Sequence, residues 1–121
     1  MDNIESILIS IKKLLGIDEN DENFDMDIII HINSVFSILT QLGVGPKNGF
    51  SIIDEDAVWT DFIPENKVEM VKSYMHLKVK LIFDPPAATA VIESIKEMIK
   101  ELEWRINIAV DPEAEEESQN G

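Results

Sequence analysis

The stretch KVKLIFDPPAATAVIESIKEMIKELEWRI, from Lys78 to Ile106, decides the fold because Asp84-Pro85-Pro86 interrupts an otherwise helical pattern. Pro85 has no N–H and clashes with the preceding helical turn, so a helix arriving from the N-terminal side must end near Phe83. Proline is nevertheless accepted in the first turn of a new helix, and Asp84 can supply a capping oxygen. The sequence therefore predicts a tight antiparallel hairpin of two helices, with Asp84, Pro85 and Pro86 as its structural junction.

The second helix of this hairpin carries the clearest apolar stripe in the chain. Its members recur at i, i+3 and i+4, and they are Val91, Ile92, Ile95, Met98, Ile99, Leu102 and Ile106. At 100° per residue, Trp104 falls almost opposite the centre of this stripe. Tryptophan is enriched at protein interfaces, so Trp104 is expected either to pack under a loop of its own chain or to contact a partner.

Three further helices are predicted from the same periodicity. The first runs from about Ile4 to Leu15, with Asp2 and Glu5 at the spacing of a capping box and Gly16 as its left-handed end. The second covers about Phe24 to Leu42, and the third about Glu65 to Phe83.

The second predicted helix is apolar on most of its circumference, since Ile29, Ile30 and Ile38 lie on its flanks and back. A helix of this kind is normally buried on most sides. It is therefore expected either to form the centre of the bundle or to face another subunit.

The region from Lys47 to Pro64 is predicted as a structured connection. "GFSII" is a candidate extended piece, and one helical turn capped by Asp54 or Asp56 would turn Trp59 and Phe62 inward. The fold class is thus all-α: a small bundle of about four main helices in a domain of residues 1–110. A flexible, acidic tail of residues 111–121 follows it.

The charge of the chain restricts its partners. Its 121 residues include 24 acidic and 10 basic side chains, a net charge of -14. Such a surface repels nucleic acids and anionic membranes, so no specific nucleic-acid or membrane binding is expected. Much of the acid stands in the tail and in DENDENFDMD, Asp18 to Asp27. No signal peptide or long apolar run is present, and a soluble intracellular protein is expected.

Familiar catalytic and metal-binding patterns are missing. The acidic loop fails as an EF-hand because Ile29 or Ile32 would occupy the position of the bidentate glutamate. His31 and His76 are single histidines on separate helices, there is no cysteine, and "LGVGPKNG" lacks the Lys-Ser/Thr of a P-loop. We expect no enzyme, no metal and no cofactor.

The chain resembles the small head–tail connector (head-completion or adaptor) proteins of tailed bacteriophages and prophages of Gram-positive bacteria. Four stretches carry the resemblance in matching order. They are FDMDIIIHINSVFSILTQLGVGP (Phe24 to Pro46), GFSI followed by WTDF (Gly49 to Phe62), VKSYMHLKVKLIFDPP (Val71 to Pro86) and IKELEWRINIA (Ile99 to Ala109).

The resemblance implies a helical protein that forms a ring, twelvefold like the portal, between the portal and the tail. Such a ring would continue the DNA channel and dock other neck or tail-completion proteins. It would be found in the virion neck, and in the host cytoplasm before assembly. The candidate residues for the oligomer or portal interface are Trp104, Arg105, Ile108, Ile30 and Ile38.

The main alternative is an acidic inhibitor that mimics DNA and occupies a basic nucleic-acid enzyme of the host. A mimic spreads its carboxylates along one face, whereas here they cluster in a loop and a tail, and the last helix mixes Glu with Lys. This distribution favours the connector hypothesis.

Overall fold

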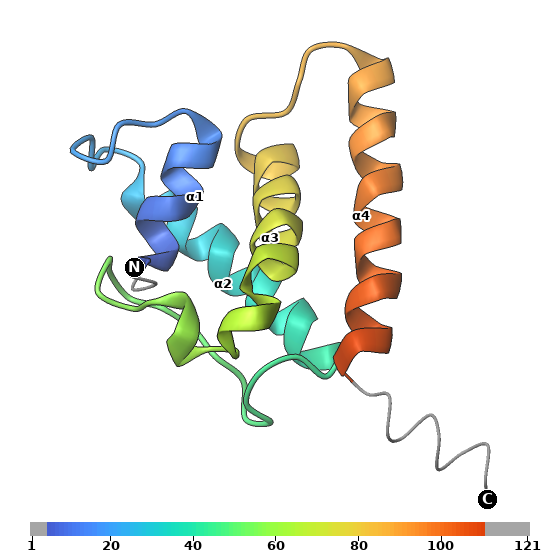
Figure 1. Ribbon diagram of the computed structural model, residues 1–121. Coiled ribbons are helices and arrows are strands. Elements are labelled where there is room, and N and C mark those ends of the chain that lie inside the picture. Colours follow the sequence, from blue (N-terminus) through green and yellow to red (C-terminus); the bar gives the residue numbers. More distant parts are fainter. Residues whose placement is uncertain (1–4, 111–121) are drawn as a thin grey trace, which may run out of the picture.

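The structure of the protein, a computed structural model, describes residues 5–110 (Figure 1). The elements are α1 (Ile7–Leu15), α2 (Asp25–Gln41), η1 (Trp59–Asp61), η2 (Glu65–Lys67), α3 (Val68–Phe83) and α4 (Thr89–Val110). One isolated antiparallel bridge, between Ser6 and Val58, is the β-pairing found in this range. The predicted all-α bundle is confirmed. The predicted tail, residues 111–121, lies outside the described residues.

Helix α3 is the centre of the bundle, because it packs against α1, α2 and α4. Helix α4 packs mainly on α3 and runs antiparallel to it as the outermost helix in Figure 1. The expectation that the second helix could form the centre is therefore wrong. Its outer face carries Ile30, which is 57% exposed.

One contiguous hydrophobic core joins all four α-helices with the connection between α2 and α3. Burial of each large apolar side chain contributes about 1.5–3 kcal/mol relative to exposure. The largest apolar side chains that are essentially inaccessible to water are Trp59, Tyr74, Phe36, Ile7, Leu8, Ile11, Ile28, Ile32, Leu39, Ile52 and Met75.

Helix α1 begins later than the sequence suggested, and its cap is different. The backbone of Glu5 is held outside the helix, since the Trp59 N–H donates to the Glu5 carbonyl (3.2 Å) and the Ile7 N–H donates to the Ala57 carbonyl (3.0 Å). Ser6 caps the helix instead, accepting from the Ile9 N–H at 3.2 Å. The predicted start at Ile4 and the predicted capping role of Glu5 are thus wrong, and Asp2 lies outside the described residues. Gly16 ends the helix in the left-handed conformation, as predicted (φ 84°).

The connection between α2 and α3 is structured, as expected, and buries Trp59 and Phe62. The predicted helical turn is η1, but neither Asp54 nor Asp56 caps it. The Asp54 side chain instead accepts from the Asp56 N–H (2.8 Å) in an Asx turn, and Asp61 accepts from the Val58 N–H (3.1 Å).

The α3–α4 hairpin forms as predicted, although its junction is longer than expected. Helix α3 ends at Phe83, and the Asp84 N–H still donates to the Lys80 carbonyl (2.9 Å). Asp84 and Pro85 each precede a proline, which disfavours the helical conformation for both. Helix α4 therefore begins only at Thr89, and the Ala88 carbonyl accepts its first hydrogen bonds. The predicted cap at Asp84 is wrong.

Candidate interaction surface

The outer face of α4 carries Trp104 and Ile108, which are 64% and 39% exposed. They lie on the opposite side of the helix from Ile99 and Ile106, which are buried in the core. Because Trp104 is mostly exposed, it is not buried under a loop of residues 5–110, and its contact with a partner stays a prediction. A large aromatic side chain left in water is a feature typical of a binding surface.

A hydrogen bond between α3 and α4 contributes to this orientation of α4. The buried Tyr74 hydroxyl of α3 donates to a Glu103 carboxylate oxygen at 2.7 Å. Burial, together with this hydrogen bond, raises the pKa of Tyr74 above its ordinary value. Because Glu103 is turned toward α3, the next residue, Trp104, is turned about 100° away from it.

Arg105 lies beside this face and pairs with Glu101 one turn earlier, with 2.6 Å between Nη2 and Oε2. Both side chains also line an open groove of about 280 Å³ between α3 and α4, together with Ser73, Leu77, Met98 and Leu102. Met98 is 51% exposed there. The predicted apolar stripe of α4 is therefore only partly covered by α3.

Ile30 and Ile38 occupy different environments on α2. Ile30 is exposed, whereas Ile38 is half-buried and packs against the core. No Asp, Glu, Lys or Arg occurs from residue 28 to residue 46, a long gap in a chain with 28% charged residues. Ile30 and Ile38 lie on α2, whereas Trp104 lies on α4, which packs mainly on α3.

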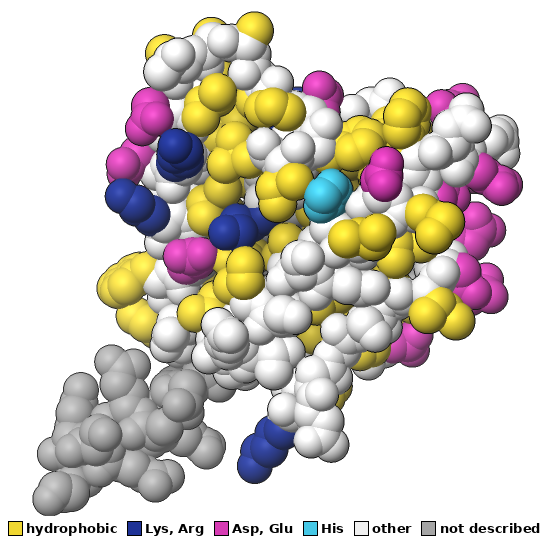
Figure 2. All heavy atoms as spheres, turned by 180° about the vertical axis from the view of Figure 1, so that it is seen from behind, with side chains coloured by type: hydrophobic (Ala, Val, Ile, Leu, Met, Phe, Trp, Pro, Cys, Tyr) yellow, Lys and Arg dark blue, Asp and Glu magenta, His cyan; other side chains and the backbone are white. Residues whose placement is uncertain are grey.

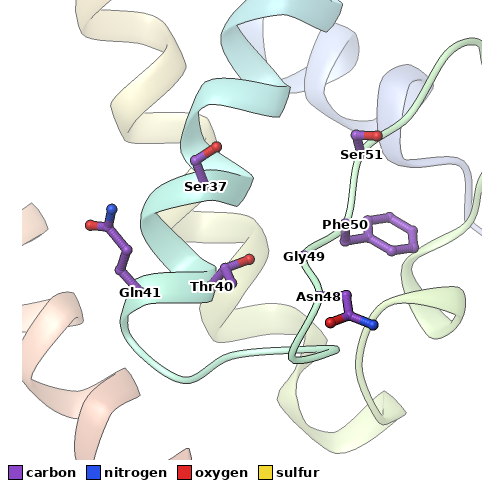
Figure 3. Close-up of a pocket in the computed structure, with 7 residues that line it drawn as sticks. All are labelled: Ser37, Thr40, Gln41, Asn48, Gly49, Phe50 and Ser51. Atoms are coloured by element: carbon purple, nitrogen blue, oxygen red, sulfur yellow. The ribbon is translucent and has the colours of Figure 1, made fainter.

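Beside the C-terminal half of α2 lies an open hollow of about 640 Å³ (Figure 3). Its walls are Ser37, Thr40 and Gln41 on α2 and residues 48–51 of the following connection, so no charged side chain lines it. We call it the α2 hollow. Sequence reasoning missed it because its two walls are brought together only by the tertiary fold.

Asn33 attaches the connection to α2. Its side-chain amide donates to the Ile52 carbonyl (3.0 Å), and its side-chain oxygen accepts from the Ile52 N–H (2.8 Å). One amide side chain thus satisfies both backbone groups of a buried residue, as a neighbouring strand would. This pair holds the wall of the α2 hollow in place.

The acidic loop is tied to the body by Lys12, whose side chain is fully buried. Its Nζ donates to the Glu19 carbonyl (3.1 Å) and lies 2.8 Å from Asp25 Oδ1. Figure 2 shows Asp and Glu side chains gathered along the edge on the α1 side, away from α4. Hydrophobic side chains are spread over the face between the two.

The two histidines lie on different helices, His31 on α2 and His76 on α3. His31 lies edge-on to Phe83, with ring centroids 6.5 Å apart. Burial, with a smaller effect of the nearby Lys80, lowers the pKa of His76. Within residues 5–110, no group of three His, Asp or Glu side chains is placed to hold a metal ion. None of the helices described there is long and apolar enough to span a membrane.

These features define a small all-α protein whose exposed groups suit binding to another macromolecule. A sequence model of the phage connector protein family matches residues 7–113, most of the chain. The protein therefore belongs to this family of structural head–tail connectors of bacteriophages. No curated protein and no solved structure gives a significant match to the chain.

Proposed function

We propose that the protein assembles as a ring between the portal and the tail of a phage particle, where it continues the DNA channel and docks the tail. The observation that carries this proposal is the family match over residues 7–113. The exposed outer face of α4 supports it, because a ring subunit must offer side chains to its neighbours.

On this proposal, Trp104, Arg105 and Ile108 contact the portal or a neighbouring subunit, and Ile30 and Ile38 contribute a second contact region. The ring matches the twelve subunits of a portal, and other neck or tail-completion proteins bind its far side. The region from Trp104 to Ala109 leads into a C-terminal segment that docks on the portal.

The charge of the chain fits passage of DNA through such a ring. A net charge of -14 repels the phosphate backbone, whereas a wall rich in Lys and Arg would bind it and slow its movement. On this proposal the DNA passes through the ring without a specific contact, and no cofactor is expected.

Quantitative mass spectrometry of purified particles tests the proposal. Tailed particles are expected to contain this chain and the portal protein in nearly equal copy numbers. If the chain is expressed in the cell but absent from particles, the connector proposal fails and the acidic inhibitor becomes the better hypothesis.

A further inference from the structure

The α2 hollow has the chemistry of a site for an indole ring. Thr40 Oγ1 donates to the Phe36 carbonyl of its own helix (3.0 Å), so the hydroxyl hydrogen is used while the oxygen can still accept. An indole N–H is a donor only, and it needs such an acceptor when it is buried. Among the seven lining residues Phe50 is the apolar one, and its ring packs in an aromatic cluster with Phe36 and Phe62.

Elsewhere in the molecule, one indole N–H already donates to a helix hydroxyl that is itself bonded to a backbone carbonyl. The buried Trp59 Nε1–H donates to Ser10 Oγ at 2.8 Å, and the Ser10 hydroxyl donates to the Ile7 carbonyl of its own helix at 3.0 Å. Thr40 repeats the role of Ser10, since each is a helix hydroxyl that donates to a carbonyl three or four residues earlier. No indole occupies the second arrangement within the described chain.

The α2 hollow is open to a side chain from outside. Gly49 has a φ of 93°, a conformation that favours glycine, so this part of the wall carries no side chain; a Cβ there would lie in ordinary contact with Thr40 Oγ1, at 3.8 Å. In Figure 3 the Thr40 hydroxyl is on the side of α2 that faces the 48–51 segment, while Gln41 points the other way.

The chain also carries one indole, that of Trp104, which is not buried in the core. Trp104 is 64% exposed, and α4 supplies no wall of the α2 hollow. The same chain therefore presents an unfilled indole site and an uncovered indole on different elements. Every copy has both, so the indole of one copy can be accepted by the next copy along.

We propose that Trp104 of one copy inserts into the α2 hollow of a second copy. This deepens the proposed ring, on which its biological meaning rests, by assigning the contact between neighbouring subunits. We take the contact to be head-to-tail, with the two surfaces of each copy meeting different neighbours, because this kind of contact closes into a ring when the rotation allows.

Charged side chains flank both surfaces. Lys100, one turn before Trp104, has only a weak ion pair, with Nζ 4.0 Å from Glu97 Oε2, and Glu101 also lies one turn before Trp104. Beyond the 48–51 wall the chain continues into the 86% exposed Ile53 and three exposed carboxylates, Asp54, Glu55 and Asp56. An ion pair between Lys100 and this exposed segment would add little to the contact, so the proposal depends on the indole.

The cysteine-free sequence allows a direct test in the full-length purified protein. Lys100→Cys and Asn48→Cys place one thiol beside Trp104 and one in the α2 hollow. The two variants are mixed at concentrations approaching millimolar and treated with a short bismaleimide. Cross-linked heterodimer is expected, and the matched mixture of Lys100→Cys with Lys13→Cys, an exposed site on α1, is expected to give little. Equal yields from the two mixtures, or a chain that stays monomeric and uncross-linked throughout, would overturn the proposal.

Two further variants test the indole and the direction of the contact. Trp104→Ala in the Lys100→Cys chain is expected to lower the yield about tenfold or more, as loss of a central aromatic anchor does. Ser37→Glu in the Asn48→Cys chain should do the same, while Ser34→Glu, one turn away and outside the α2 hollow, should not.

A chain carrying both Lys100→Cys and Asn48→Cys should form a ladder of multimers. A product that stops at dimers would exclude the head-to-tail contact. None of these results depends on particles, so the connector function is tested separately by mass spectrometry.

Discussion

The two tryptophans of this protein show how differently its two regions are built. Trp59 is 1% exposed, begins η1 in the connection before α3 and donates to Ser10 of α1. Trp104 is 64% exposed on α4. The same residue type therefore stabilises the fold in one region and remains available to a partner in the other.

The regions also differ in how their helices are held. The part from α1 to α3 is fastened by buried polar groups, among them Lys12, and by the paired amide of Asn33. Helix α4 is held chiefly by one apolar face on α3 and by the Tyr74–Glu103 hydrogen bond. If assembly depends on α4 as proposed, stability and assembly lie in separate parts of the chain and should be separable by mutation.

The largest loss of stability is expected from Trp59→Ala. The change removes a buried indole and leaves a cavity, which costs about 3–5 kcal/mol of unfolding free energy. Urea unfolding followed by circular dichroism measures this loss. A cost below about 1 kcal/mol, the range of ordinary point mutations, would show that the core does not depend on Trp59.

Lys12→Ala should also destabilise the protein strongly, by about 3 kcal/mol, because it leaves Asp25 and the Glu19 carbonyl without their buried partner. Lys13→Ala is the matched control, since Lys13 is exposed and lies 4.0 Å from Glu19. The control should change the unfolding free energy by no more than about 0.5 kcal/mol. Equal losses of unfolding free energy from the two substitutions would show that the contacts of Lys12 with Glu19 and Asp25 do not stabilise the fold.

Tyr74→Phe is expected to loosen α4 with a smaller cost, about 1 kcal/mol, because one hydrogen bond to a carboxylate is lost. Hydrogen exchange should quicken in α4 more than in α1 or α2.

The same hydrogen bond predicts a dependence on alkaline pH. The pKa of Tyr74 is raised in the folded state from a reference of 10.0, so its contribution is complete below pH 10. It is lost as pH rises above that value toward the higher pKa of the folded state. Exchange in α4 should therefore accelerate above pH 10 relative to α1 in the wild-type protein, and this extra acceleration should be absent in Tyr74→Phe. An equal acceleration in the variant would show that another group titrates.

The smallest effect on stability is expected from Trp104→Ala, no more than about 0.5 kcal/mol, because the ring is already in water. Its unfolding midpoint in urea should match that of the wild-type protein. A large loss would mean that Trp104 supports the fold and would remove the contrast with Trp59.

The sequence predicted the parts of this fold that depend on local periodicity and chain chemistry. The stripe on α4 and the exposed position of Trp104 follow from helical spacing alone, and Gly16 ends α1 for a local reason. The late start of α4 could also have been predicted, since two successive residues precede prolines.

Other features depend on contacts between distant segments. The start of α1 is set by pairing of Glu5 with Trp59, which no local pattern reveals. Lys12 reads as a surface residue, although its spacing of four from Leu8 and three from Leu15 places it on the apolar face. Six carboxylates follow Lys12 in residues 18–27, and no Lys or Arg occurs from residue 14 to residue 46. This excess of acid next to one lysine was the sequence signal that Lys12 could be a buried partner of the acidic loop.

The most direct test of the central claim is the copy number of Trp104→Ala in purified tailed particles, measured by mass spectrometry against the portal protein. The account predicts that the variant folds with wild-type helicity and stability in solution but is depleted from particles, or that the particles formed lack tails. A folded variant that enters tailed particles at the wild-type copy number would contradict it.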